Sequence, residues 1–414
     1  MATQSLPRQN AISELTQLLG ERLTTSNAVR DQHANGECGV YAPQPPDAVA
    51  FPHSTEEVAE IVRTCAAHGV PMIPYGVGTS VEGNVTAPHG GICIDLSEMN
   101  NIVRVGEADL DVTVQAGVTR KQLNMHLKDT GLFFPIDPGA DATLGGMAAT
   151  RASGTNAVRY GTLRENVLGL TVVLPDGKII KTGGRVGKNV TGYDLCKLLA
   201  GSYGTLSVLT EITVKVLPAP QKTRTLLVLG QSAEDAQSAM TLALNSPHEV
   251  SAAAWLPGDL TTRSSVGYLQ RAGSAVTALR VEGPEPSVIA RCDALRALLA
   301  GQGEMEELHY HNSAGFWHEV GSATFFTEEP SGDGTSEEGS KTPVWRLSIP
   351  PAEMPLATAA IAGHCQAEYY ADWGGGLIWL RVTPELEDAG AGVIRAAIAP
   401  RGGHATLIRA SEDI

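Results

Sequence analysis

The chain of 414 residues is 43% hydrophobic and contains 45 glycines and 24 prolines, which suits two or three packed domains of a soluble globular protein. Its formal net charge of −15 argues against a nucleic-acid-binding protein. Phosphate recognition needs a clustered positive surface, and 30 Lys and Arg against 45 Asp and Glu do not readily supply one.

The cysteines and the N-terminal region narrow the class of protein further. The six cysteines lie too far apart for a local zinc or iron–sulfur motif, so we expect reduced thiols and no metal site. Residues 1–40 predict a helical segment without the features of a signal peptide, and no apolar run approaches the roughly 18 residues that span a bilayer. We therefore expect a cytoplasmic protein.

The first element with a clear pattern is a helix in "STEEVAEIVRTCAAHGV", residues 54–70. Ser54 and Glu57 fit a capping box at its start, and Gly69 suits its end. The apolar residues that fall on one face of this helix are Val58, Ile61, Val62 and Cys65.

A glycine-rich loop, "PYGVGTSVEGN" at residues 74–84, lies between a short apolar run and a stretch that predicts strand and turn. Val81 stands where the dinucleotide-binding pattern G-x-G-x-x-G needs glycine, so a Rossmann site is a weak interpretation. Successive backbone N–H groups around glycines can instead form an anion-binding concavity, which would suit a pyrophosphate. A plain glycine turn is the structural alternative, and the loop alone leaves both open.

Residues 111–185 are unusually dense in small side chains. "DVTVQAG" predicts a strand, residues 119–131 predict a helix capped by Thr119 and ended by Gly131, and "LTVVLPDGKIIKTGG" predicts a hairpin. Between them runs a long glycine-rich connection without strong periodicity, which we expect to be functional. Its small and polar residues would allow close approach by a flat ligand and bind its edges: Gly145, Gly146, Gly154, Ser153, Thr155 and Asn156.

The second half alternates strands with helices. "TRTLLVLG", "AVTALRVEG" and "VWRLSIPP" read as strands, and each precedes a helical stretch. This pattern predicts an α+β domain with an antiparallel sheet over residues 221–414. The polar, acidic stretch at 327–341 predicts a mobile loop within it.

Four segments of the first half resemble a known family: "PYGVGTSVEGN", "GVTRKQLN", "FPIDPGADATLGGMAATRASGTNAVRYGT" and "VVLPDGKIIKTGGR". They resemble the FAD-binding domain of vanillyl-alcohol oxidase (PCMH-type) flavoproteins, and especially FAD-linked D-lactate dehydrogenases and the D subunit of glycolate oxidase. The resemblance implies an α+β fold, with a two-subdomain PCMH-type FAD-binding domain over 41–220 followed by an α+β cap domain over 221–414.

In that family the first loop wraps the FAD pyrophosphate, and the later glycine-rich segments line the flavin. Carried over, the resemblance implies non-covalent FAD with a phosphate loop made of Pro74, Tyr75, Gly76, Val77, Gly78, Thr79 and Ser80. It also implies a second set of FAD contacts, made of Pro138, Gly139, Thr143, Gly145, Gly146, Ala149, Ser153, Gly154, Asn156, Tyr160 and Gly161.

From about residue 186 the resemblance changes to the E subunit of glycolate oxidase. The segments that carry it are "KNVTGYDL", "GSYG", "TPVWRLSIP", "YADWGGGLIWLRV" and "RGGHATLIRA". Both families place the first two segments against the adenine half of FAD, which makes secondary candidates of Gly201, Gly204, Thr205 and Ile212. The alternating pattern around Ile212 also fits a strand in a sheet core.

The residues that would do the chemistry are less clear. Related D-lactate and glycolate dehydrogenases carry H-x-G-D-G-N-x-H and E-H-G segments, and neither occurs in this sequence. Oxidation of a 2-hydroxy acid needs a base for the hydroxyl proton and usually a cation for the carboxylate. His404 is the nearest candidate for the base and Arg346 for the carboxylate. The structural alternatives are a hydrogen-bonded histidine on a strand and an arginine paired with acidic neighbours.

Three functions remain open. The first is an FAD-binding subunit of a glycolate oxidase (dehydrogenase) complex that acts on glycolate or D-lactate beside a catalytic flavoprotein subunit and an iron–sulfur subunit. Such partner subunits would place the cytoplasmic chain at the periphery of the inner membrane. The second is a self-sufficient FAD-dependent D-2-hydroxy-acid dehydrogenase. The third is a structural subunit that keeps the fold without using FAD, which the intact glycine loops disfavour.

Overall fold

The structure is a computed structural model that describes residues 2–34, 36, 42–326, 342–383, 386 and 388–411, with side chains from residue 6 onward. The expected mobile loop at 327–341 and Cys38 lie outside the described residues. The chain forms two compact units, Met1–Ser153 with Gly161–Pro218, and Gly154–Tyr160 with Ala219–Ile414. The short segment 154–160, which the sequence assigns to the FAD-binding domain, thus belongs to unit 2.

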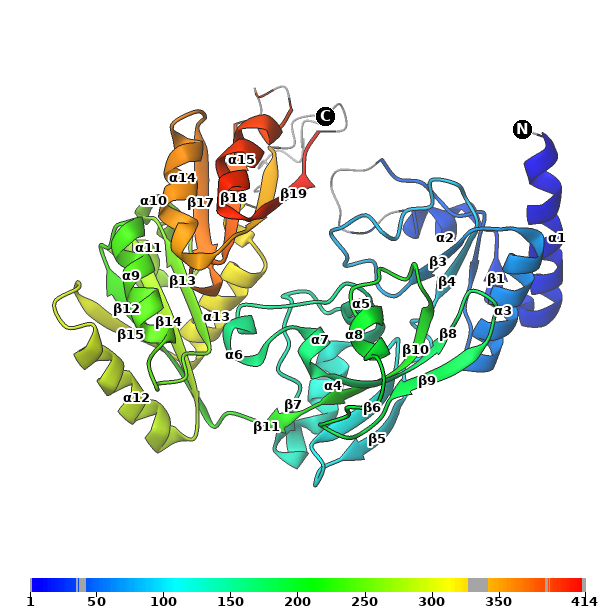
Figure 1. Ribbon diagram of the computed structural model, residues 1–414, viewed down its shortest axis with the longest axis horizontal. Coiled ribbons are helices and arrows are strands. Elements are labelled where there is room, and N and C mark those ends of the chain that lie inside the picture. Colours follow the sequence, from blue (N-terminus) through cyan, green and yellow to red (C-terminus); the bar gives the residue numbers. More distant parts are fainter. Residues whose placement is uncertain are drawn as a thin grey trace. The chain divides into compact units, whose positions relative to one another are not determined.

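Unit 1 contains a small four-stranded sheet near its N-terminus (Figure 1). The strand order is β1-β2-β4-β3, in which β2, β4 and β3 are parallel and β1 is antiparallel to β2. The strands are β1 (Leu23–Thr24), β2 (Ala48–Ala50), β3 (Met72–Tyr75) and β4 (Ile92–Asp95). The glycine-rich loop at 76–84 therefore connects two adjacent parallel strands.

A second, antiparallel sheet of unit 1 has the order β5-β6-β10-β8-β9. Its strands are β5 (Ile102–Gly106), β6 (Asp111–Gln115), β8 (Val167–Val173), β9 (Ile179–Gly183) and β10 (Val208–Lys215), and a two-stranded ribbon joins β7 (Leu132–Phe133) to β11 (Leu217–Pro218). The predicted hairpin is confirmed, because Val173 pairs with Ile179 across the turn. The two sheets match the two expected subdomains.

The helices of unit 1 follow the local sequence signals. They are α1 (Ala2–Leu19), α2 (Asn27–Gln32), α3 (Thr55–His68), α4 (Arg120–Leu127), α5 (Leu144–Ala149), α7 (Leu163–Asn166) and α8 (Leu195–Leu199). In α3 the hydroxyl of Ser54 accepts from the N–H of Glu57, and Gly69 ends the helix with a φ of 63°. In α4 the predicted cap at Thr119 is present as a full capping box.

The predicted capping box of α3 is wrong in its second half. The Glu57 carboxylate accepts from the N–H of His53 at 2.8 Å rather than from Ser54, and it pairs with Arg22 at 2.6 and 2.7 Å. The two bonds from the Arg22 guanidinium favour this position of the carboxylate over the box geometry, because a bidentate ion pair is stronger than a single hydrogen bond from a backbone N–H.

Unit 2 is built on one eight-stranded antiparallel sheet in the order β15-β12-β14-β13-β17-β18-β16-β19. The strands are β12 (Lys222–Leu229), β13 (Ala252–Leu256), β14 (Val276–Gly283), β15 (Met305–His309), β16 (Val344–Ser348), β17 (Ala367–Asp372), β18 (Leu377–Val382) and β19 (His404–Arg409). The expected antiparallel sheet of the cap domain is thus present.

Helices of unit 2 cover parts of both faces of this sheet. One face packs on α9 (Ala233–Leu244), α12 (Glu285–Leu298), α14 (Met354–Ala362) and α15 (Ala391–Ile398) in a large apolar cluster. The other face packs on α10 (Gly258–Thr261), α11 (Gly267–Ala272) and α13 (Tyr310–Gly321) in a second cluster. The short helix α6 (Ala157–Tyr160) also contacts β13. We call the face that packs on α10, α11 and α13 the α13 face.

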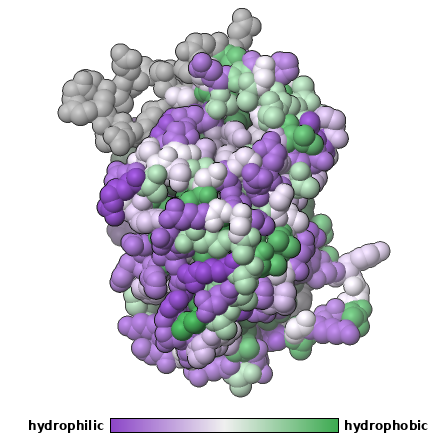
Figure 2. Space-filling model, turned by 90° about the vertical axis from the view of Figure 1, so that its left-hand side faces the viewer, coloured by the Kyte–Doolittle hydropathy of each residue, from purple (hydrophilic) through white to green (hydrophobic). Residues whose placement is uncertain are grey.

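None of the described helices combines the length and the apolar character that crossing a bilayer requires. On the face shown in Figure 2, hydrophilic side chains are interleaved with smaller apolar areas.

Candidate functional site

The glycine-rich loop of unit 1 lies tightly against the start of α5. A Cβ atom built on Gly76 would lie only 2.4 Å from Oγ1 of Thr143, the residue that caps α5. Any side chain at position 76 would therefore push the loop away from α5. Gly76 and Thr143, which the sequence assigns to one site, are in contact.

The backbone of this loop offers a row of free donors. Within the described residues, no backbone N–H group of residues 76–80 donates a hydrogen bond to the protein. Consecutive free N–H groups around glycines form a concavity that binds anions, with no need for a cationic side chain. This arrangement fits a pyrophosphate and favours the anion-binding interpretation over the plain glycine turn.

The first turn of α5 uses its own backbone groups differently. The N–H of Gly145 donates to the carbonyl of Ala116 at 2.9 Å, and a Cβ on Gly145 would lie 2.8 Å from the Cβ of Ala116. Close packing inside unit 1 is thus sufficient to require glycine at 145. Gly146 is partly exposed, and its N–H donates to Thr143 Oγ1 at 3.2 Å.

A third segment completes this cluster. The N–H groups of Gly201 and Tyr203 donate to the carbonyls of Ala148 and Ala149, at 2.9 and 2.8 Å. Gly204 lies against the ring of Pro74, and a Cβ built on Gly204 would lie 3.1 Å from the Cγ of Pro74. The phosphate loop, α5 and the 201–204 segment are therefore brought together, as the resemblance implies.

Other predicted FAD residues of unit 1 are more scattered. Pro138 and Gly139 lie on the partly exposed connection before α5, and Ser153 and Gly161 flank the segment that joins unit 2. Ile212 is fully buried on β10 and is paired with β6 and β8, so its side chain belongs to the sheet core.

In unit 2, the segment 154–160 is fixed at its first residue. The carbonyl of Gly154 accepts from Nε1 of Trp373 at 2.9 Å, and also from the N–H of Ala157. Trp373 begins a short 3-10 turn, η5 (Trp373–Gly375), which follows β17. Trp373 thus contacts a segment that the resemblance places at the flavin.

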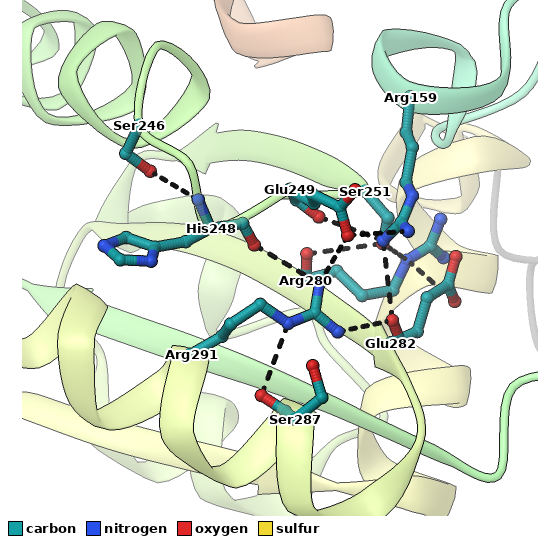
Figure 3. Close-up of polar contacts among 9 residues, drawn as sticks. All are labelled: Arg159, Ser246, His248, Glu249, Ser251, Arg280, Glu282, Ser287 and Arg291. Carbon is teal, nitrogen blue, oxygen red and sulfur yellow. Dashed lines mark hydrogen bonds and ion pairs between the residues drawn. The ribbon is translucent and has the colours of Figure 1, made fainter.

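The other end of the segment is held by charges (Figure 3). Arg159 on α6 donates to the carboxylate of Glu249 at 3.1 Å and to the backbone carbonyls of Glu249 and Glu282, at 3.1 and 3.4 Å. Arg291 from α12 reaches the same two glutamates, at 3.4 Å to the Glu249 carboxylate and 2.8 Å to the Glu282 carbonyl. Burial and the nearby charge of Arg159 lower the pKa of Arg291.

Next to these groups lies Tyr160. Burial raises its pKa, and the neighbouring Glu282 carboxylate raises it further, so the phenol is neutral at physiological pH. Nε of Arg280 on β14 forms an ion pair with the Glu282 carboxylate at 3.8 Å and donates a hydrogen bond to Oγ of Ser251 at 3.1 Å.

The catalytic candidate Arg346 contacts Trp373, the residue that donates to Gly154 of the 154–160 segment. Its guanidinium carbon lies 5.5 Å from the ring centre of Trp373. The neighbouring Asp372 is 1% exposed, and burial raises its pKa to about 7, although the Trp373 N–H, Arg280 and Arg346 oppose the rise. The sequence analysis did not select Asp372. The signal available was its place before three glycines in "DWGGG".

The second catalytic candidate, His404, lies on the edge strand β19. Ser348 pairs with His404 and Arg346 pairs with Thr406, so His404 and Arg346 project from the α13 face of the sheet. His404 is exposed, whereas Arg346 is partly buried. Among the described residues, no group of three or more His, Cys, Asp and Glu is arranged to hold a metal ion.

One part of the chain matches a known protein family. A family model described as an FAD binding domain matches residues 46–183. A "Probable D-lactate dehydrogenase, mitochondrial" of Danio rerio is 49% identical over 217 residues, which cover 51% of this chain and 44% of the relative. A "Glycolate oxidase subunit GlcD" of Bacillus subtilis is 38% identical over 226 residues, covering 54% and 48%. The match thus spans less than half the length of either relative.

Solved structures resemble the chain over nearly its whole length. A 4-ethylphenol oxidase from Gulosibacter chungangensis has a TM-score of 0.75 at 19% identity, covering 100% of this chain and 90% of the oxidase. A p-cresol methylhydroxylase has a TM-score of 0.73 at 14% identity, covering 98% and 90%. Such identities show the fold alone. Residues 46–183 thus match the FAD binding domain family, and the chain has the PCMH-type fold of these solved structures.

Proposed function

We propose that this chain binds FAD non-covalently and takes part in the oxidation of a small 2-hydroxy acid of the glycolate or D-lactate type. The observation that carries the proposal is the row of N–H groups at residues 76–80, which donate to no described residue and lie inside the domain that matches the FAD-binding family. These groups, with α5 and the 201–204 segment beside them, would hold the pyrophosphate. The relatives named as D-lactate dehydrogenase and glycolate oxidase subunit support the substrate class.

When bound, FAD supplies the hydride acceptor that oxidation of an alcohol carbon requires. Arg346 would pair with the substrate carboxylate, because a guanidinium matches a carboxylate in shape and charge. His404 would take the proton of the hydroxyl group as general base. Both roles are supported by their position on one face of the same sheet, two residues apart along adjacent strands.

The finer proposal is that the chain works as a subunit of a glycolate oxidase-type complex, beside a catalytic flavoprotein and an iron–sulfur subunit. The relative named as a glycolate oxidase subunit favours it. A self-sufficient D-lactate dehydrogenase is the second candidate, favoured by the 49% identity to a protein named as such. Several relatives are named as mitochondrial, so the cytoplasmic location expected from the sequence stays a prediction.

The test is an anaerobic visible spectrum of the purified chain, recorded before and after addition of glycolate, D-lactate or L-lactate. We expect a flavin spectrum, and bleaching by glycolate or D-lactate but not by L-lactate would identify a self-sufficient dehydrogenase. A flavin that bleaches only after the partner subunits are added would support the complex. A colourless protein that takes up no added FAD would contradict the proposal and favour a structural subunit.

A further inference from the structure

The residue that contacts Gly154 has an unusual backbone conformation. Trp373 has a φ of +54°, a left-handed value that a bulky side chain rarely adopts without support from its surroundings. Gly374 and Gly375 follow with φ values of 65° and 99°, and a Cβ on Gly375 would lie 2.1 Å from Oε1 of Gln237. Residues 373–375 thus form a tight left-handed turn, and Trp373 is the one residue of this turn with a side chain.

A buried carboxyl group holds this turn. Oδ1 of Asp372 accepts from the N–H of Trp373 at 2.7 Å, and Asp372 is almost fully buried. The charged groups that face it are Arg280 of β14 and Arg346 of β16. Burial of a carboxyl group costs free energy unless the group is hydrogen-bonded, and here Oδ1 makes such a bond with the N–H of Trp373.

The indole of Trp373 has two contacts that link different parts of unit 2. Its Nε1 donates to the carbonyl of Gly154, and its ring lies under the guanidinium of Arg346. Arg159 fixes the other end of the 154–160 segment to Glu249 and Glu282 (Figure 3). The segment is therefore held at both ends by unit 2, while the residues before and after it belong to unit 1.

We propose that Asp372 and Trp373 are positioning residues. Asp372 fixes the left-handed turn, and Trp373 then sets the carbonyl of Gly154 and the guanidinium of Arg346 relative to each other. The inference deepens the proposed function and rests on it for the roles of Arg346 at the carboxylate and of residues 154–160 at the flavin. The contacts themselves do not depend on it.

Hydrogen–deuterium exchange of the full chain, without substrate, tests the contact with Gly154. Trp373→Phe removes the indole N–H and keeps an aromatic ring under Arg346. We expect peptides that cover residues 154–160 to exchange about three- to tenfold faster, the range that loss of one hydrogen bond implies. Trp379→Phe is the matched control, because Trp379 lies directly opposite Arg346 on β18 and forms no hydrogen bond to this segment. Equal exchange in the two variants would overturn the proposal.

A pair of substitutions at Asp372 tests the acceptor. Asp372→Asn keeps a carbonyl oxygen for the Trp373 N–H, whereas Asp372→Ala removes it. We expect Asp372→Ala to exchange like Trp373→Phe and Asp372→Asn to stay within about twofold of the wild type. Fast exchange in both variants, or in neither, would contradict the acceptor role.

A kinetic measurement then separates this inference from the proposed function. If the chain oxidises a 2-hydroxy acid, Trp373→Phe should lower kcat more than it raises KM, because the ring under Arg346 remains. A rise in KM alone would contradict the positioning role. A wild-type chain that shows the expected exchange but is not reduced by any hydroxy acid would contradict the proposed function and leave the contacts intact.

Discussion

Unit 1 and unit 2 prepare their candidate sites with different parts of the chain. Unit 1 offers backbone groups: the N–H groups of residues 76–80 donate to no described part of the chain, and the loop lies against α5 because Gly76 has no side chain. Unit 2 offers side chains: Arg346 and His404 from one sheet face, and a buried Asp372 beside Trp373. A backbone site fixes where a cofactor can lie, whereas a side-chain site provides charge and proton transfer.

This difference predicts which substitutions each unit should tolerate. A backbone site depends on close packing, so it is sensitive to any added atom and indifferent to charge. A side-chain site depends on charge and protonation, so single polar substitutions should change activity and leave folding intact. The predictions that follow test this division, beginning with the chemistry of unit 2.

The largest effect is expected for His404→Gln. If His404 is the base, loss of proton transfer should slow flavin reduction by a 2-hydroxy acid about 10²- to 10⁴-fold. Anaerobic stopped-flow measurement of flavin bleaching gives the rate. Because His404 is exposed, the free energy of unfolding should change by less than about 0.5 kcal/mol. Thr406→Ser, at an exposed position on the same strand and face, is the control. A rate within threefold of the wild type would exclude this role for His404.

Substitution of Arg346 should weaken substrate binding. Arg346→Gln removes the charge, and a hydrogen bond to a charged group is worth about 1.5–3 kcal/mol, so kcat/KM should fall about 10- to 100-fold. Arg346→Lys should recover part of the loss, since it keeps the charge but not the planar donor pair. The amount of bound FAD should not change in either variant. If FAD content falls with kcat/KM, Arg346 acts on the cofactor and not on the carboxylate.

Two adjacent glycines of α5 sharpen the comparison within unit 1. Gly145→Ala would place its Cβ 2.8 Å from that of Ala116 and should lower the free energy of unfolding by about 1–3 kcal/mol. Gly146→Ala meets only Thr143 Oγ1, at 3.1 Å, and alanine favours a helix, so its change should stay within about 0.5 kcal/mol. Urea denaturation of the two variants measures both values. Equal stabilities would show that packing against Ala116 does not require the glycine.

The smallest effect concerns the acid stability of unit 1. The Arg22 guanidinium lowers the pKa of Glu57 from 4.5 to about 2, so this carboxylate stabilises the folded state above pH 4.5 and loses that contribution as the pH falls toward 2. Glu57→Gln should cost about 1 kcal/mol at neutral pH and flatten the loss of stability in that interval. Unfolding curves from pH 2 to 7 test this.

Glu60→Gln on the same helix is the control for the acid-stability measurement. Glu60 is more exposed and forms an i,i+3 pair with Arg63 at 2.9 Å, which should contribute about 0–0.5 kcal/mol. If both variants have the same pH profile, the ion pair of Glu57 with Arg22 does not stabilise the fold.

Local signals in the sequence predicted most of the elements. The cap at Thr119, the end of α3 at Gly69 and the hairpin from Val173 to Ile179 were all found, because each depends on residues within a few positions of one another. The capping box of α3 was predicted incorrectly because Arg22, which lies 35 residues before Glu57, takes the carboxylate. Distant ion pairs leave no local pattern.

The glycine pattern of the phosphate loop could be read from the sequence, since a backbone site needs small residues in one stretch. The sequence did not show why each glycine is present. Gly145 packs on Ala116, whereas residues 76–80 keep their donors free, and only the fold separates these two reasons. Likewise Ile212 fits a cofactor pattern in the sequence but is part of the sheet core.

By itself, the sequence determined the α+β class, the FAD-binding domain and the antiparallel sheet of the second half, because each depends on short-range periodicity or on contiguous motifs. Only the tertiary structure decided that residues 154–160 belong to unit 2, and that Trp373 contacts both Gly154 and Arg346. The hydrogen bond from Trp373 to Gly154 joins positions 219 residues apart. It forms because α6 packs against β13, which pairs with β17 just before Trp373, and contacts of that range leave no local pattern in the sequence.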